Sequence, residues 1–272
     1  GHVDREFGQA VAWDTPLLQG YEFRVLNNEN GVPLSGPASL TGRGVWTLLR
    51  REKPKAILLT QAYYRFDHAA YLAALSLRVP ILIRQETQDA MQSGTRGRFK
   101  SLARYLAYRA MYAPVKHAFS FGQLNRQHLQ RHGFANRQLS TAHFSVVDAV
   151  SHLSSEEKMA RRAQLRASLG VRPEQVLVGF FGKLIDIKNP GLIMEAAARL
   201  AAPWQQRLHL MLVGAGRLVS SFKEQAIQLQ QKAGIPSSFC GFINQSNLPD
   251  YYLSCDIAVL PSRREAWGLV IN

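Results

Sequence analysis

Short apolar runs of strand length alternate along the chain with segments long enough for helices, and this alternation constrains the fold more than any other feature. The clearest runs are 56–60, 79–83 and 176–181. They show no polar–apolar alternation, as is typical of strands buried on both faces of a parallel sheet. Strands separated by helices of about 10–15 residues indicate parallel βαβ units. The sequence therefore predicts an α/β protein.

The first half of the chain contains several such units. Strands are predicted at 21–26, 56–60, 81–84 and 117–121, and helices at 45–52, 68–77, 99–113 and 125–132. Asp67 stands where the N-cap of the second helix is expected. Gly133 is expected to end the fourth helix as its C′ residue.

The second half repeats the alternation after a change in composition near Asp148. Ser154 and Glu157 form an S-x-x-E capping box ahead of a basic helix that runs to Leu169. Further strands are predicted at 176–181, 208–213, 238–241 and 257–260, and helices at 190–200, 220–233 and 248–254.

These elements predict two Rossmann-like doubly wound domains that face each other across a cleft. The expected domains are residues 1–150 and 151–272, with a linker near 146–156. A doubly wound domain has more elements after its fourth strand than this chain has, so we expect the second domain to be incomplete.

Composition narrows the choice of partners and compartment. The net charge is +14, from 33 Lys and Arg against 19 Asp and Glu. Such an excess fits polyanions, acidic lipid surfaces and phosphorylated small molecules. Cys240 and Cys255 are too few for a disulfide framework, which favours a reducing, cytoplasmic compartment. No apolar run approaches the roughly 18 residues that a membrane-spanning helix needs.

The loop after the strand at 176–181 holds the first candidate residues. Gly182 permits a tight turn, and Lys183 and Lys188 can converge on one anion across the short loop. Lysine acts in such places as a compact positive charge for phosphate. The alternative is two exposed lysines in a surface loop.

A second glycine-rich turn, Gly214-Ala215-Gly216, follows the strand at 208–213. A dinucleotide fingerprint would require glycine at position 219, where Val219 stands, and an acidic residue about 20 positions further on. We therefore interpret this segment as a tight turn between strand and helix.

The third segment, 261–270, again follows a predicted strand. The amides of Gly268 and Leu269 would open the next helix, and free N–H groups at a helix start attract anions. Glu265 could accept hydrogen bonds from sugar hydroxyls, or it could simply complement the helix dipole.

Taken in order, these segments resemble the family 4 retaining glycosyltransferases of the glycosyltransferase B fold. The resemblance rests on 180–184 with Lys188, on 212–216, on Gly241-Phe242, on 254–262 and on 265–270. In the first half, Trp13-Asp14 with Pro16-Leu17-Leu18, and Arg65-Phe66-Asp67, are similar to the acceptor domain of bacterial members.

The resemblance implies a hexosyltransferase or related enzyme of polysaccharide or glycolipid biosynthesis, with a nucleoside-diphosphate sugar as donor and a glycan, lipid or small molecule as acceptor. It places Lys183 and Lys188 on the donor diphosphate and Glu265 on the donor sugar. It places the backbone of Phe242 and Ile243 at the nucleotide base and the amides of Gly268 and Leu269 near the distal phosphate. Gly182 and Ser262 complete the implied donor-binding residues. The ribose-binding glutamate of the family's E-x7-E motif would fall at position 273, so we expect a chain truncated within the donor site.

No D-x-D motif or clustered His and Asp suggests a metal, so we expect neither a metal nor another cofactor. Retaining transfer mainly needs fixed cations and amides that stabilise the leaving diphosphate.

In the first domain, Glu86 or Arg84 follows a strand end and could meet the acceptor or the donor sugar; Glu86 is the second catalytic candidate. A solvated charge at a strand end is an equal alternative.

The basic segment 96–109, with interleaved Phe99, Leu102 and Leu106, could lie on the anionic inner face of a membrane. Its alternative is an ordinary amphipathic helix packed on the sheet.

Two rival functions remain open. One is a non-catalytic fragment of such an enzyme, and the other is a basic polyanion-binding module. Nucleic acid is not an expected partner, because the sequence has no ribonucleoprotein or zinc motif.

Overall fold

The computed structural model describes residues 2–4, 9–11, 13–16, 18–27, 36–89 and 98–272. The chain forms two compact units, one of residues 21–145 and the other of residues 146–272 together with 1–20. The division after Ser145 falls at the start of the predicted linker. The first 20 residues group with the C-terminal unit, whereas the sequence assigns them to the N-terminal domain.

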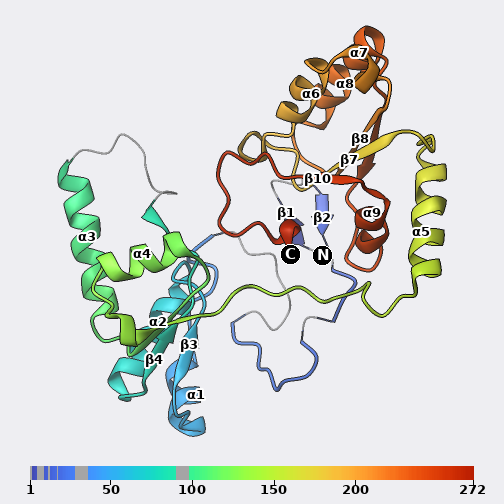
Figure 1. Ribbon diagram of the computed structural model, residues 1–272. Coiled ribbons are helices and arrows are strands. Elements are labelled where there is room, and N and C mark those ends of the chain that lie inside the picture. The colour runs from blue at the N-terminus through green and yellow to red at the C-terminus, as the bar shows by residue number, and fades with distance from the viewer. Residues whose placement is uncertain (1, 5–8, 12, 17, 28–35, 90–97) are drawn as a thin grey trace. The chain divides into compact units, whose positions relative to one another are not determined.

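The C-terminal unit is built on a four-stranded parallel sheet (Figure 1). Its strands are β7 (Val176–Phe181), β8 (Leu208–Val213), β9 (Ser237–Gly241) and β10 (Ile257–Val259). Their order in the sheet is β10-β7-β8-β9, and every neighbouring pair is parallel. The predictions for β7 and β8 are confirmed residue for residue, because both strands are mainly apolar and most of their residues are buried.

Helices cover both faces of this sheet (Figure 1). On one face, α6 (Gly191–Ala198) and α8 (Val219–Ala233) pack Met194 and Phe222 against Phe180 and Leu212. On the other face, α9 (Leu248–Ser254) packs Tyr252 against Phe181, and α5 (Ser155–Ser168) lies against α9. A short helix, α7 (Ala202–Gln205), connects α6 to β8. The unit is therefore doubly wound.

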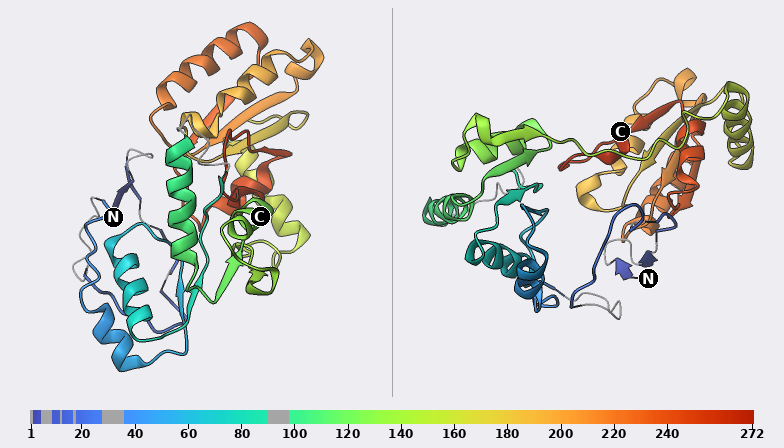
Figure 2. Two further views of the ribbon diagram at one scale, coloured as in Figure 1. Left: turned by 90° about the vertical axis from the view of Figure 1, so that its left-hand side faces the viewer. Right: turned by 90° about the horizontal axis from the view of Figure 1, so that it is seen from below.

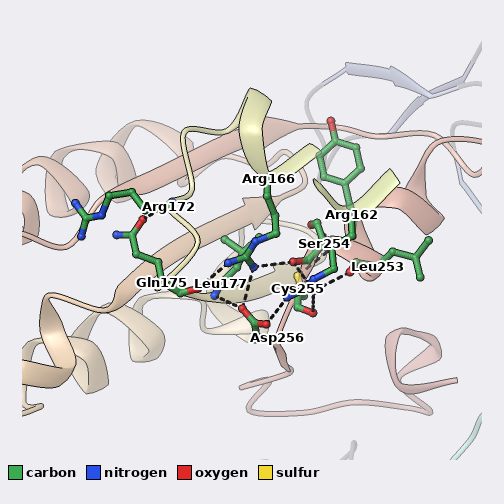
Figure 3. Close-up of polar contacts among 10 residues, drawn as sticks. Arg162, Arg166, Arg172, Gln175, Leu177, Leu253, Ser254, Cys255 and Asp256 are labelled. Atoms are coloured by element: carbon green, nitrogen blue, oxygen red, sulfur yellow. Dashed lines mark hydrogen bonds and ion pairs between the residues drawn. The ribbon is translucent and has the colours of Figure 1, made fainter. Parts of the chain in front are cut away.

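Two arginines of α5 bind the end of α9 and the start of β10 (Figure 3). Arg162 Nη1 donates to the carbonyls of Leu253, Ser254 and Cys255 at 2.9–3.0 Å. A cation at this place satisfies carbonyls left open at a helix C-terminus and opposes its dipole.

The carboxylate of Asp256 joins this arginine pair to the sheet (Figure 3). It pairs with Arg162 and with Arg166, whose Nη1 lies 2.9 Å from Asp256 Oδ2. The same oxygen accepts a hydrogen bond of 2.7 Å from Leu177 N in β7. Arg162 and Arg166, which contribute to the positive net charge, thus hold β10 beside β7 through Asp256.

The capping box at the start of α5 is confirmed. Ser154 Oγ accepts from Glu157 N at 3.1 Å, and Glu157 Oε2 accepts from Ser154 N at 2.8 Å. Hydrogen bonding with the backbone and the side chain of Ser154 lowers the pKa of Glu157.

The N-terminal unit contains a second parallel sheet in the sequential order β3-β4-β5-β6. Its strands are β3 (Ile57–Leu59), β4 (Ile81–Ile83), β5 (His117–Ser120) and β6 (Leu139–Thr141). Its helices are α1 (Val45–Glu52), α2 (Arg65–Ser76), α3 (Arg98–Tyr112) and α4 (Gln123–Arg131). Buried residues of α2, α3 and α4, such as Ala74, Tyr112 and Leu129, form one core with β4 and β5. The prediction of two α/β units with parallel sheets is confirmed (Figure 2).

Three local predictions were wrong or incomplete. Residues 21–26 form no strand, and Tyr21 and Phe23 are exposed. Asp67 is not an N-cap: α2 begins two residues earlier, and the Asp67 carboxylate accepts from the amides of Tyr63 and Tyr64. The antiparallel pair β1 (His2–Asp4) and β2 (Gln9–Val11) was not predicted.

Candidate functional site

The strand order of the C-terminal sheet defines where a ligand can enter. The chain runs from β7 to β8 to β9 in one direction, and then returns to place β10 on the opposite side of β7. Ligands of open α/β sheets bind outside the carboxyl ends of the strands at such a reversal. The two loops that flank it follow β7 and β10, and they contain Lys183, Lys188, Ser262 and Glu265.

Lys188 and Glu265 meet at this reversal. Lys188 Nζ lies 2.6 Å from Glu265 Oε2, and the two side chains are 24% and 27% exposed. The backbone also joins the loops, because Arg263 N donates to Ile187 O at 2.9 Å. Lys188 ends the short 3₁₀ turn Asp186–Lys188, and Asn189 follows it with φ of 51°. A cation and a carboxylate thus converge where the sequence analysis placed the diphosphate and the sugar.

Lys183 lies in the same loop, directly after Gly182. Gly182 has φ of 155°, and its amide donates to Val213 O at 2.9 Å, so the start of the loop stays attached to the end of β8. The Lys183 side chain is half-buried. Its contact with a phosphate stays a prediction.

The glycines after β8 serve close packing of loops. A Cβ atom on Gly214 would stand 1.9 Å from Gly182 O, and one on Gly216 would stand 2.5 Å from Leu184 O. Gly214 N donates to Gly241 O at 2.7 Å, and Leu184 N donates to Ala215 O at 2.9 Å. The loops after β7, β8 and β9 are therefore joined through their backbones, which supports the interpretation of this segment as a tight turn.

The loop after β10 departs from its predicted form. Leu269–Ile271 is a single 3₁₀ turn, and Gly268 precedes it with φ of 82°. One such turn does not provide the N-terminus of an α-helix, so anion binding by the amides of Gly268 and Leu269 stays a prediction. Ser262 Oγ is buried and has no hydrogen-bond partner among the described residues. Buried hydroxyls of this kind normally have a partner.

The last two donor-binding candidates lie in the loop after β9. Ile243 packs into the core beneath α9. The ring of Phe242 lies 6.1 Å from that of Trp13, centroid to centroid. No sequence signal linked these two aromatic residues.

Glu86 belongs to the N-terminal unit. It is exposed, and it lines an open hollow of about 560 Å³ beyond the carboxyl ends of β3 and β4. Arg84, its alternative, donates to Ala142 O through Nε at 3.3 Å and lies over the Phe144 ring at 3.9 Å. Arg84 is thus held by contacts within the unit, whereas Glu86 lines the hollow beside Gln85 and Thr87.

A cluster of two buried histidines and the half-buried Asp89 lies in the same unit and was not predicted. Ligand atoms of Asp89, His128 and His132 lie within 4.8 Å of one another. His128 Nδ1 contacts Asp89 Oδ1 at 2.7 Å, and its Nε2 contacts the Tyr112 hydroxyl at 3.2 Å. Both ring nitrogens thus have protein partners. The i,i+4 spacing of His128 in α4 and His132 at its C-cap was the one signal that could have revealed it.

The surroundings in this cluster lower the pKa of both His128 and Asp89. Burial lowers the pKa of His128, and the nearby His132 ring lowers it further against the opposing effect of Asp89. Burial alone would raise the pKa of Asp89, but hydrogen bonds and charge from His128 and Arg131 outweigh it and lower the pKa.

Solved structures with the same fold define the class. HepE from Anabaena, in complex with UDP and glucose, aligns with 84% of this chain and 58% of its own at a TM-score of 0.60 and 16% identity. WaaG, a glycosyltransferase involved in lipopolysaccharide biosynthesis, aligns with 76% of this chain and 60% of its own at a TM-score of 0.53 and 16% identity. The chain has the α/β fold of the glycosyltransferase B type.

A described family matches much of the C-terminal unit. Residues 161–272 match the family described as glycosyl transferases group 1. The stretch includes Lys183, Lys188 and Glu265.

Curated relatives agree with this family. The D-inositol 3-phosphate glycosyltransferase of Geodermatophilus obscurus is 35% identical over 117 residues, which is 40% of this chain and 26% of the relative. That of Streptomyces bingchenggensis is 23% identical over 222 residues, which is 78% of this chain and 48% of the relative. The chain thus spans about a quarter to a half of the length of these relatives.

Proposed function

We propose that this chain belongs to a retaining, family 4 type glycosyltransferase that moves a hexose or related sugar from a nucleoside diphosphate to an acceptor. The C-terminal unit binds the donor in this proposal. The main support for this proposal is the ion pair at the reversal of strand order, where Lys188 Nζ lies 2.6 Å from Glu265 Oε2.

The chemistry of this pair suits a sugar diphosphate. Glycosyl transfer leaves a diphosphate, whose growing charge must be stabilised by groups that are already in place. An ammonium group has three donors, so Lys188 can keep Glu265 as a partner and still bind a phosphate oxygen. Lys183 would supply a second cation from the same loop. Glu265 would accept hydrogen bonds from hydroxyls of the sugar.

The buried hydroxyl of Ser262 supports a ligand at this place. It lies three residues before Glu265, and its Oγ has no partner among the described residues. A buried polar group without a hydrogen bond costs about 1–3 kcal/mol. A donor phosphate or hydroxyl would remove this cost. Gly182, Phe242, Ile243, Gly268 and Leu269 complete the proposed donor site, and no metal or other cofactor is proposed.

The acceptor is proposed to bind to the N-terminal unit, with Glu86 as the contact residue in the hollow beyond β3 and β4. A glycan, a lipid or a small molecule remains the acceptor class. The relatives named above are inositol-phosphate glycosyltransferases, and an acceptor with phosphorylated hydroxyls would also suit the chain's net charge of +14.

Membrane contact is a second part of the proposal, and α3 supports it. Phe99, Leu102 and Leu106 are 84%, 56% and 55% exposed, whereas Tyr108 and Tyr112 on another face of the helix pack toward α4. The apolar residues that could have packed on the sheet thus face outward, beside the exposed Lys100 and Arg109. Apolar and basic side chains on one exposed face suit the inner surface of an anionic membrane. Among the described residues, no helix is long and apolar enough to cross a membrane.

The polyanion-binding alternative loses part of its support. Arg162 and Arg166, which belong to its basic helix, are bound to Asp256 and to backbone carbonyls within the unit.

The experiment that tests the proposal is calorimetric titration of uridine, guanosine and adenosine diphosphates into the chain, followed by turnover with the matching sugar donor. Saturable binding of one nucleotide supports donor binding. Absence of binding by all three would favour the non-catalytic fragment.

A further inference from the structure

The N-terminal segment reaches the loop that follows β9. Ser246 N donates to both carboxylate oxygens of Asp14 at 3.3 Å, and Ser246 Oγ also donates to this carboxylate. Asp14 N donates in turn to Asn244 Oδ1 at 3.4 Å. Figure 2 shows the blue N-terminal segment beside the C-terminal unit in its right-hand view. We call residues 242–247 the β9 loop.

An aromatic contact accompanies these hydrogen bonds. The ring of Trp13 lies 6.1 Å from the ring of Phe242 at an interplanar angle of 56°. About half of the Trp13 side chain stays exposed, at 47%. Trp13 therefore contacts the β9 loop with part of its ring and offers the rest to solvent or to a ligand.

The β9 loop lies on the same edge of the sheet as the Lys188–Glu265 pair. Three strand-to-strand steps separate β10 from β9, which is about 14 Å at the usual spacing of about 4.8 Å. Gly214 N donates to Gly241 O, so the loops between the two places are continuous through their backbones. A nucleoside diphosphate whose phosphates lie at Lys188 can extend along this edge to the β9 loop.

The chemistry of the β9 loop suits a nucleobase better than another phosphate. Its polar residues are uncharged, and their side chains can both donate and accept hydrogen bonds, as the edge of a base requires. They are Asn244, Gln245, Ser246 and Asn247. Phe242 and Trp13 add aromatic faces, and stacking of a base on an aromatic side chain is worth about 1–3 kcal/mol. Asp14 is the one acidic group bound to this loop among the described contacts, and its carboxylate is directed at Ser246.

We infer that Trp13 and Asp14 belong to the donor site at its base end. Trp13 packs against the nucleobase, and Asp14 is a positioning residue that holds the β9 loop in its binding conformation. The inference rests on the proposed function, and it changes the role of a segment that the sequence analysis assigned to the acceptor side.

The test separates the base from the diphosphate. Trp13→Leu, Asp14→Asn and Ser246→Ala are titrated with pyrophosphate and with the nucleoside diphosphate that binds the unmodified chain most tightly. We expect fivefold or greater loss of nucleotide affinity in Trp13→Leu, about threefold or greater loss in the other two, and unchanged pyrophosphate affinity in all three. Trp204→Leu, which removes another exposed tryptophan from α7, is the control and should bind like the unmodified chain.

The other possible results distinguish a failure of this inference from a failure of the proposed function. Unchanged nucleotide affinity in all three variants overturns the inference and leaves the proposed function standing. Equal losses for nucleotide and pyrophosphate also overturn it, because the residues would then act on the whole unit. An unmodified chain that binds none of the three nucleotides overturns the proposed function, and the inference with it. Unfolding of one variant leaves the other two, since Asp14 and Ser246 make the same contact from opposite sides.

Discussion

Lys188 Nζ lies 2.6 Å from Glu265 Oε2 across the reversal of strand order between β7 and β10. The two residues are 77 positions apart in sequence. They meet because β10 crosses back to pair with β7, and both follow these strands at their carboxyl ends. The position of this pair depends on the packing of the loops and on the attachment of β10, which gives two predictions about stability.

Gly214→Ala should strongly destabilise the C-terminal unit. The added Cβ would stand 1.9 Å from Gly182 O, and the φ of 142° disfavours any side chain. We expect a loss of unfolding free energy of about 3 kcal/mol or more, at the upper end for single substitutions. Gly234→Ala is the control: its φ is 67°, but the Cβ would meet nothing within 4 Å, so the cost should stay near 1 kcal/mol. Urea unfolding measures both, and equal costs would contradict the account of loop packing.

Asp256→Asn should loosen β10 from β7. The substitution removes the negative charge that both Arg162 and Arg166 contact, although the amide oxygen can still accept from Leu177 N. We expect a cost of about 1.5–3 kcal/mol, the range for hydrogen bonds to charged groups. Asp250→Asn, which affects the more exposed pair with Arg161, is the control and should cost under about 1 kcal/mol. Equal unfolding free energies for the two variants would show that Asp256 does not hold the strand.

The Asp89–His128 pair should make the N-terminal unit sensitive to acid. The pKa of His128 is lowered in the folded state. As the pH falls through about 6.5, His128 therefore binds a proton more readily in the unfolded state than in the folded state. The pKa of Asp89 is also lowered, so its contribution is lost at still lower pH. Both effects have the same sign, and stability falls with acidification.

Thermal unfolding at pH 7.5 and 5.5 measures this effect. His128→Gln should lose less stability between the two values than the unmodified chain. His209 retains a burial-lowered pKa in the other unit, so part of the dependence remains. An identical pH dependence in His128→Gln would rule out His128 as its source.

The exposed face of α3 predicts binding to anionic vesicles. Phe99→Ser with Leu102→Ser should reduce cosedimentation with vesicles of phosphatidylglycerol and phosphatidylcholine at least fivefold, because it removes apolar area that would enter the interface. Leu192→Ser, at an exposed leucine of α6, is the matched control. Equal binding of both variants, or binding that does not depend on phosphatidylglycerol, would contradict a role for this face.

The sequence predicted those parts of the fold that repeat a simple pattern. The runs 176–181 and 208–213 are mainly apolar, and their strands have the predicted bounds. Residues 21–26 alternate apolar and polar side chains over most of their length, but they form no strand in the structure, so alternation alone did not decide strand formation. Asp67 was placed at the wrong cap position because an acidic residue near a helix start can act from N-cap or from the first turn.

In the candidate site, too, some features could be predicted from the sequence and others could not. Lys188 and Glu265 could be predicted because both follow strands, and the carboxyl ends of parallel strands meet at one edge. The contacts of Asp14 with Ser246 and of Asp89 with His128 join loops to distant segments, and neither follows from periodicity. The opening of a helix at Gly268 was predicted from its position, whereas the described residues form one 3₁₀ turn there.

Titration of nucleoside diphosphates into lysine variants tests the central claim most directly. Lys183→Ala and Lys188→Ala should each weaken binding by about 1.5–3 kcal/mol, as expected for a hydrogen bond to a charged group, while Lys232→Ala in the last turn of α8 should have no effect. Glu265→Gln should leave nucleotide affinity unchanged and impair turnover with the sugar donor. Undiminished affinity in the double variant of Lys183 and Lys188 would contradict the assignment of this loop to the donor diphosphate.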